Sequence, residues 1–204
     1  TLRDNIGIDM NTTLNSVGSL ASVLVDAVAP TVRSVSVPAN GSYKAGDNLD
    51  FTVNTSENVT VNTTGGTPQL SLTIGATTRQ ASYVSGSGSS ALLFRYTVQT
   101  GELDSDGIAI GTLSTNGGTL RDAVSNNLNT ALNSVGATGG VRVDAVAPTI
   151  GSVDVPANAT YVAGQNLFFV VNATENVTVT TTGGTPQLGL TIGATTRQAA
   201  YNSG

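Results

Sequence analysis

The sequence has no cysteine, no histidine and no tryptophan, and it contains one methionine and one lysine, Lys44. Without cysteine the chain has no disulfide, no thiol nucleophile and no zinc–thiolate site. Without histidine it has no Ser-His-Asp triad, no imidazole general base and no imidazole metal ligand. Any metal ion would therefore need oxygen ligands, which favours calcium or magnesium.

The charge is low and acidic, with 13 Asp and Glu against 8 Lys and Arg and a net charge of −5. A basic patch for phosphates is absent, so we expect no nucleic-acid partner. No apolar run approaches the roughly 18–20 residues of a membrane span, so we expect no membrane insertion. The sequence places no nucleophile beside a base, and we therefore predict that the protein is not an enzyme.

A long internal repeat organises the chain. Val25–Thr31 recurs as Val143–Thr149, an offset of 118 residues, and residues 1–86 align on 119–204 without a gap, with 59 of 86 positions identical. Pro30 breaks regular pairing, so we place the boundary just before it. Residues 1–26 are then the C-terminal tail of a preceding repeat, 27–144 a complete repeat, and 145–204 the N-terminal half of the next.

Period-two alternation of apolar and polar residues dominates the complete repeat and predicts short strands separated by Gly- and Asn-rich turns. The clearest apolar sets are Val35/Val37, Leu49/Phe51/Val53, Leu70/Leu72/Ile74, Leu92/Phe94/Tyr96/Val98 and Val141/Val143. Seven or more strands in about 118 residues predict an all-β fold, a tandem array of immunoglobulin-like antiparallel β-sandwiches. We expect Tyr83, Phe94 and Tyr96 to fill the centre.

Alternating strand directions predict which loops share an end of the repeat. We call the end at Pro30 the leading end and the end where the chain leaves at Asp144 the trailing end. We expect the chain to reverse at Ser56–Asn58, at the leading end. The turn at Gly65–Gly66 and the loop at Ser85–Ser90 then lie away from the leading end. Gly75–Thr78 and 102–107 then return to it, and 121–123 lies near the trailing end.

This arrangement would gather carboxylates at the junctions between repeats. At the first junction we expect Asp26, Glu57, Asp104 and Asp106, joined by Asp4 of the preceding repeat. The matching residues at the second junction are Asp122, Asp144 and Glu175. Gathered carboxylates repel one another unless a cation neutralises them, and calcium accepts six to eight oxygens in flexible geometry. We therefore predict a calcium site at each junction; the alternative is that these acids are solvated turn residues.

Several motifs carry a family resemblance: Val25–Thr31, Ser56–Val61, Asp104–Ile108 and Leu120–Ala123. They resemble bacterial Ig-like repeats of giant repetitive surface proteins, including RTX-type adhesins exported by type I secretion. That family usually has Asp-Ala-x-Gly-Asn near the end of the repeat, whereas Ser125 stands here in place of the glycine. The resemblance implies an extender region, calcium at the junctions and a location outside the cell, on a bacterial surface.

The function predicted is therefore a structural stalk repeat of a large cell-surface adhesin, stiffened by calcium, with neighbouring repeats of the same chain as its partners. The alternative is an Ig-like module that binds carbohydrate or a host protein. The absence of tryptophan argues against it, as does the agreement of the copies between Thr63–Gln80 and Thr181–Gln198. The sequence leaves open whether the array contacts other copies of itself or a host surface.

Overall fold

The computed structural model describes all 204 residues and is all-β, with fourteen strands and no helix. The all-β prediction is confirmed. No helix is present that is long and apolar enough to cross a membrane. The chain divides into two compact units, Thr1–Ala145 and Val146–Gly204, which are described separately.

The first unit contains ten strands, and its first strand begins two residues after the buried Pro30. They are β1 (Val32–Ser36), β2 (Gly41–Tyr43), β3 (Asn48–Asn62), β4 (Gln69–Ile74), β5 (Thr77–Ser85), β6 (Ser89–Thr97), β7 (Leu103–Asp104), β8 (Ala109–Ser114), β9 (Thr119–Arg121) and β10 (Val141–Asp144).

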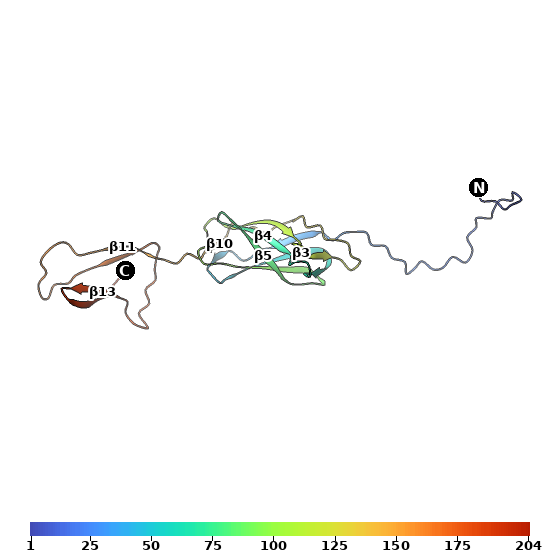
Figure 1. Cartoon of the computed structure of the whole chain (residues 1–204). Helices are drawn as coiled ribbons and strands as arrows, with labels where there is room; N and C mark the ends of the chain where they lie inside the picture. The colour runs from blue at the N-terminus through green and yellow to red at the C-terminus, as the bar shows by residue number, and fades with distance from the viewer. The chain divides into compact units, whose positions relative to one another are not determined.

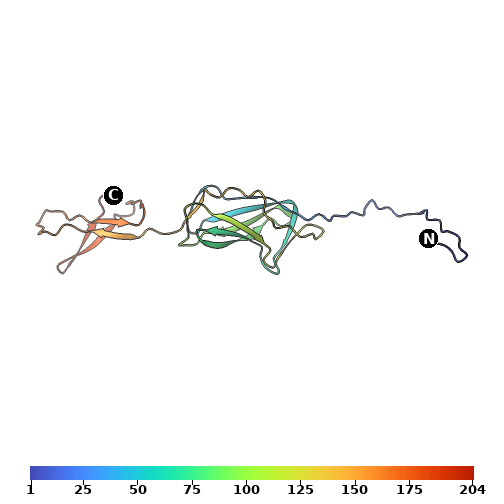
Figure 2. The same ribbon diagram turned by 90° about the horizontal axis from the view of Figure 1, so that it is seen from above.

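Seven of these strands form one sheet in the order β1-β3-β6-β5-β4-β8, with β9 paired to β3 outside this path. A smaller sheet has the order β2-β10-β7. All pairs are antiparallel except β2 with β10. The strands run along a common direction of the unit (Figures 1 and 2), and the curled antiparallel sheets are consistent with a β-sandwich.

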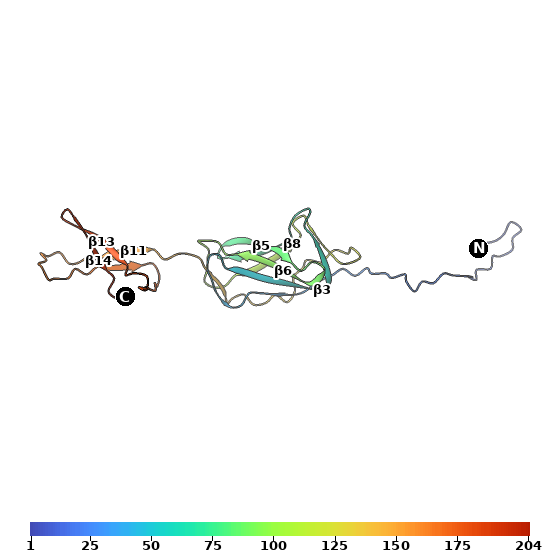
Figure 3. The same cartoon turned by 90° about the horizontal axis from the view of Figure 1, so that it is seen from below.

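The core comes from the inward positions of the alternating strands. In β3, Leu49, Phe51 and Val53 are fully buried. Strands β3 and β6 lie side by side in the sheet (Figure 3), and across this pair Phe51 is the direct neighbour of Phe94. Phe94 meets Tyr83 of β5 edge to face at 5.9 Å between ring centroids. Phe94 is buried, whereas Tyr83 and Tyr96 are partly buried against the core.

One turn prediction is wrong, and it concerns Ser56–Asn58. β3 does not reverse there but continues to Asn62, because the segment forms a β-bulge in which the pairing with β6 shifts register between Asn54 and Val59. The hydroxyl of Thr55, only 4% exposed, donates to the carbonyl of Glu57 at 2.7 Å. A bulge bends a strand without ending it, and the second half of β3 continues to pair with β9.

Because one expected reversal is missing, every later loop lies at the opposite end from the predicted one. The Gly65–Gly66 turn and the 85–90 loop lie at the leading end, since Val59 pairs with Ser89. The Gly75 turn and the 102–107 loop lie at the trailing end, where β7 pairs with β10. The expected placement of Ser56–Asn58 at the leading end agrees with the strand pairing, because the neighbouring Val59 pairs with Ser89.

The second unit repeats the local structure of the first. Its strands are β11 (Ile150–Asp154), β12 (Val170–Ala173), β13 (Gln187–Ile192) and β14 (Thr195–Ala200). The register of β11 on β12 equals that of β1 on β3 at an offset of 118 residues, including the register shift. The register of β13 on β14 likewise equals that of β4 on β5. Equivalent sequences thus adopt the same strand register in both units.

The two units differ in burial at equivalent apolar positions. Ile74 is 3% exposed in the first unit, whereas Ile192 is 54% exposed in the second. The substitution Ile74→Ala should lower the free energy of unfolding by about 2–5 kcal/mol, because it removes buried methyl groups and leaves a cavity. Ile192→Ala, the matched control, should change it by less than about 0.5 kcal/mol. Urea denaturation followed by circular dichroism measures both, and equal losses would contradict this description of the core.

A polar network lies at the trailing end, around Glu102, which is 7% exposed. Its carboxylate accepts hydrogen bonds from the guanidinium of Arg79, the Tyr96 hydroxyl at 2.6 Å and the Gln99 amide at 2.9 Å. Burial alone would raise the pKa of Glu102, but these hydrogen bonds outweigh it and leave the pKa below its usual value. The pKa of Tyr96 is raised to about 12, mainly by burial and secondly by the hydrogen bond to the Glu102 carboxylate.

A carboxyl whose pKa is lower in the folded state stabilises the fold above its unfolded pKa and loses that contribution as the pH falls through its folded pKa. We therefore expect the urea midpoint to fall as the pH is lowered below about 4.5, the ordinary value for glutamate. Glu102→Gln should lower the midpoint at neutral pH and flatten this dependence. Asp106→Asn, a change at an exposed carboxylate, is the control. A Glu102→Gln profile parallel to that of the wild type would contradict the role of the network.

Candidate metal centre

Three carboxylates from distant parts of the sequence come together at the leading end of the first unit. One ligand oxygen from each of Asp26, Glu57 and Asp122 lies within 4.8 Å of the others. Asp26 is exposed, Glu57 partly exposed and Asp122 buried. They belong to the linker before β1, the bulge of β3 and the turn after β9.

The bulge positions Glu57. Between Asn54 and Val59 the strand is not paired with β6, and Ser56 hydrogen-bonds instead to Thr31, the residue directly before β1. The Ser56 amide donates to the Thr31 carbonyl at 2.8 Å, and the Thr31 amide donates to the Ser56 hydroxyl at 2.9 Å. Glu57, next to this pair, is therefore held close to the point where the linker enters the unit.

Two glycine turns and strand β9 position Asp122. A Cβ at Gly65 would lie 2.2 Å from the Gly117 carbonyl, so the turns before β4 and β9 pack backbone against backbone. This close contact aligns β9 on the end of β3, with Arg121 opposite Thr60. Asp122, the next residue, thus lies beside the bulge that carries Glu57.

Backbone donors hold the Asp122 side chain, which is 5% exposed. One carboxylate oxygen accepts the amides of Val124 at 2.9 Å and Asn126 at 2.8 Å, and the other accepts the Asn126 side-chain amide at 2.8 Å. Burial acts to raise the pKa of Asp122, but these hydrogen bonds together have the larger, opposite effect. The pKa therefore lies below its usual value. The carboxylate is therefore charged and fixed in direction at neutral pH.

The geometry fits a hard divalent cation. Calcium–oxygen distances are about 2.3–2.6 Å, so two oxygens on one ion are separated by at most about 4.6–5.2 Å. The three carboxylates lie within 4.8 Å of one another, and each offers oxygen alone. The set therefore suits calcium better than a metal that prefers nitrogen or sulfur ligands.

Asp104 and Asp106 do not join this cluster, and their predicted place at the leading end is wrong. Asp104 pairs with Val143 at the trailing end, where its carboxylate accepts the amides of Gly75 at 2.7 Å and Gly107 at 2.8 Å. It is 5% exposed and connects two loops. Asp106 is exposed in the same loop. The missing reversal at the bulge explains both errors.

Asp122 is also misplaced in the prediction, which assigned it to the second junction with Asp144 and Glu175. The structure brings it to the leading end of its own repeat. Asp144 ends β10 opposite Leu103 at the trailing end. Glu175 lies exposed in the second unit, at the position equivalent to Glu57.

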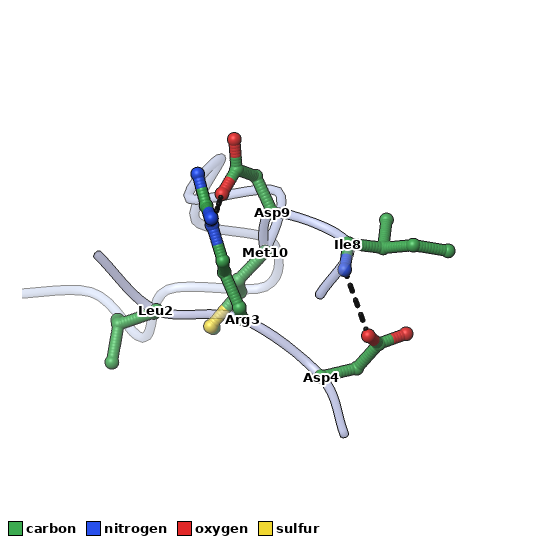
Figure 4. Close-up of a pocket in the computed structure, with 6 residues that line it drawn as sticks. All are labelled: Leu2, Arg3, Asp4, Ile8, Asp9 and Met10. Atoms are coloured by element: carbon green, nitrogen blue, oxygen red, sulfur yellow. Dashed lines mark hydrogen bonds and ion pairs between the residues drawn. The ribbon is translucent and has the colours of Figure 1, made fainter. Parts of the chain in front are cut away.

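Asp4, predicted at the first junction, lies in the N-terminal segment and is exposed. It forms the same local turn as its equivalent Asp122, since its carboxylate accepts the amides of Ile6 at 3.0 Å and Ile8 at 2.9 Å. Figure 4 shows Asp4 beside Ile8, and the Arg3–Asp9 ion pair that closes the turn. The cluster around Asp26 does not include Asp4.

One contributor was missed in the sequence, the side chain of Asn126. Its amide donates to the Asp122 carboxylate and reaches the linker carbonyls of Asp26 at 3.4 Å and Val28 at 3.3 Å. The spacing Asp122–Val124–Asn126 is the available signal, because an Asp side chain that accepts amides two and four residues later defines this turn.

Comparison with known proteins supplies no relative: no protein-family model matches the chain, and no curated protein or solved structure is significantly similar to it.

Proposed function

We propose that this chain is a segment of an extracellular stalk, built from tandem sandwich repeats of immunoglobulin-like type, in which a calcium ion at the start of each repeat stiffens the linker. The single observation that carries the proposal is the convergence of Asp26, Glu57 and Asp122. The linker provides one of these carboxylates, and the body of the repeat provides the other two.

The repetition supports a spacer role. Equivalent segments of the two units adopt the same strand register at an offset of 118 residues. A unit that is copied with its local structure intact extends a chain by a fixed length, so the reach of an array scales with the number of copies. The outer surface, rich in Thr, Ser and Asn, suits a location outside the cell.

The electrostatics support a cation at the linker. Three carboxylates this close repel one another, and the lowered pKa of Asp122 prevents relief by protonation of that group at neutral pH. A divalent ion removes this repulsion and at the same time joins the linker to the bulge of β3 and the turn after β9. The expected affinity is about 10⁻⁴–10⁻³ M, the range of extracellular calcium modules.

Isothermal titration of the chain with calcium tests this proposal. We expect about one ion per chain, because the complete trio occurs once, at the first unit. Glu57→Gln and Asp122→Asn should each weaken binding at least tenfold, since each removes a charged ligand. Asp106→Asn, in the acidic loop at the trailing end, is the matched control and should leave binding unchanged.

No measurable binding by the wild-type chain at millimolar calcium would refute the metal site. Binding that Asp106→Asn abolishes and Glu57→Gln preserves would place the ion at the trailing end and equally contradict the proposal.

A further inference from the structure

We propose that the side-chain amide of Asn126 is a latch that fastens the linker Asp26–Ala29 to the body of its repeat, so that Asp26 is held near the other two carboxylates before any ion binds. This inference deepens the proposed function by naming the residue that pre-organises the site. The latch itself consists of protein–protein hydrogen bonds and does not require a cation.

The contacts of Asn126 reach both sides of the junction. Its Nδ2 donates to the Asp122 carboxylate at 2.8 Å and to the linker carbonyls of Val28 at 3.3 Å and Asp26 at 3.4 Å. The amide has two hydrogens for three acceptors, so the two longer contacts share one donor. The buried carboxylate of Asp122 fixes the orientation of the amide, and the amide in turn holds alternate carbonyls of the linker.

Little else holds this part of the linker. The residues Val25 and Val28 are 87% and 70% exposed, so apolar packing does not anchor them. Pro30 is the first buried residue of the segment, and its carbonyl accepts the Asn129 amide at 2.8 Å. The backbone therefore anchors the linker at Pro30, whereas Asn126 anchors it at Asp26 and Val28.

The N-terminal copy of the repeat already has a different residue at the latch position. Ile8 occupies the position equivalent to Asn126, and an isoleucine side chain cannot donate a hydrogen bond. The turn around Ile8 nevertheless keeps the carboxylate–amide hydrogen bonds from Ile6 and Ile8 to Asp4. Isoleucine is thus compatible with the turn, and Asn126→Ile should remove the latch without unfolding the turn after β9.

The experiment is ¹⁵N relaxation of the full 204-residue chain in the presence of a chelator. In the wild type we expect backbone order parameters near 0.85 at Ala27, Val28 and Ala29, and in Asn126→Ile values below about 0.6. The amides of Val124 and Asn127 should stay rigid in both. Asn127→Asp is the matched control, because Asp9 occupies that position in the other copy; it should leave the linker rigid.

Unchanged order at Ala27–Ala29 in Asn126→Ile would overturn the latch, and so would equal loosening in Asn127→Asp or loosening of the whole turn together with the linker. A calcium titration of the same samples separates the two proposals. If the wild type binds no calcium, the proposed metal site fails, whereas the relaxation data in chelator still decide the latch. If calcium binds, Asn126→Ile should weaken it several-fold.

Discussion

The β-bulge at Thr55–Asn58 is the constraint on which the rest of the structure depends. It lets β3 cross the leading end of the unit without reversing, so one strand pairs first with β6 and then with β9. It also frees Ser56 to bond with Thr31 and turns Glu57 toward the linker. The directions of all later strands, and therefore the positions of all later loops, follow from this local irregularity.

The same bulge explains why a site forms where the linker meets the repeat. The linker approaches β1, β1 pairs with β3, and β9 follows the far half of β3, so Asp26, Glu57 and Asp122 are neighbours in space although they lie up to 96 residues apart in sequence. Two of the three belong to the paired framework, and the third belongs to a segment held by hydrogen bonds. A cation there would connect this hydrogen-bonded linker segment directly to the two carboxylates of the framework.

Much of the fold could be predicted because strand alternation and the 118-residue repeat are strong local signals. Leu49, Phe51 and Val53 are buried as their spacing requires. The bulge could not be predicted, because Ser56–Asn58 has the composition of a turn and only the pairing with Thr31 and β9 makes it continue. The prediction therefore grouped Asp26 and Glu57 correctly. It placed Asp104 and Asp106 beside them, whereas the structure places Asp122 there.

We propose that an ion bound by Asp26, Glu57 and Asp122 stiffens the linker between repeats. Small-angle scattering of a protein with three consecutive copies of residues 27–144, in calcium and then in chelator, tests it most directly, because each internal junction contains Asp144 in place of Asp26. We expect a larger maximum dimension and a narrower distribution of distances in calcium, and no such change when Glu57 is replaced by Gln in every copy. An unchanged maximum dimension for the wild-type sequence would show that calcium does not stiffen the linker.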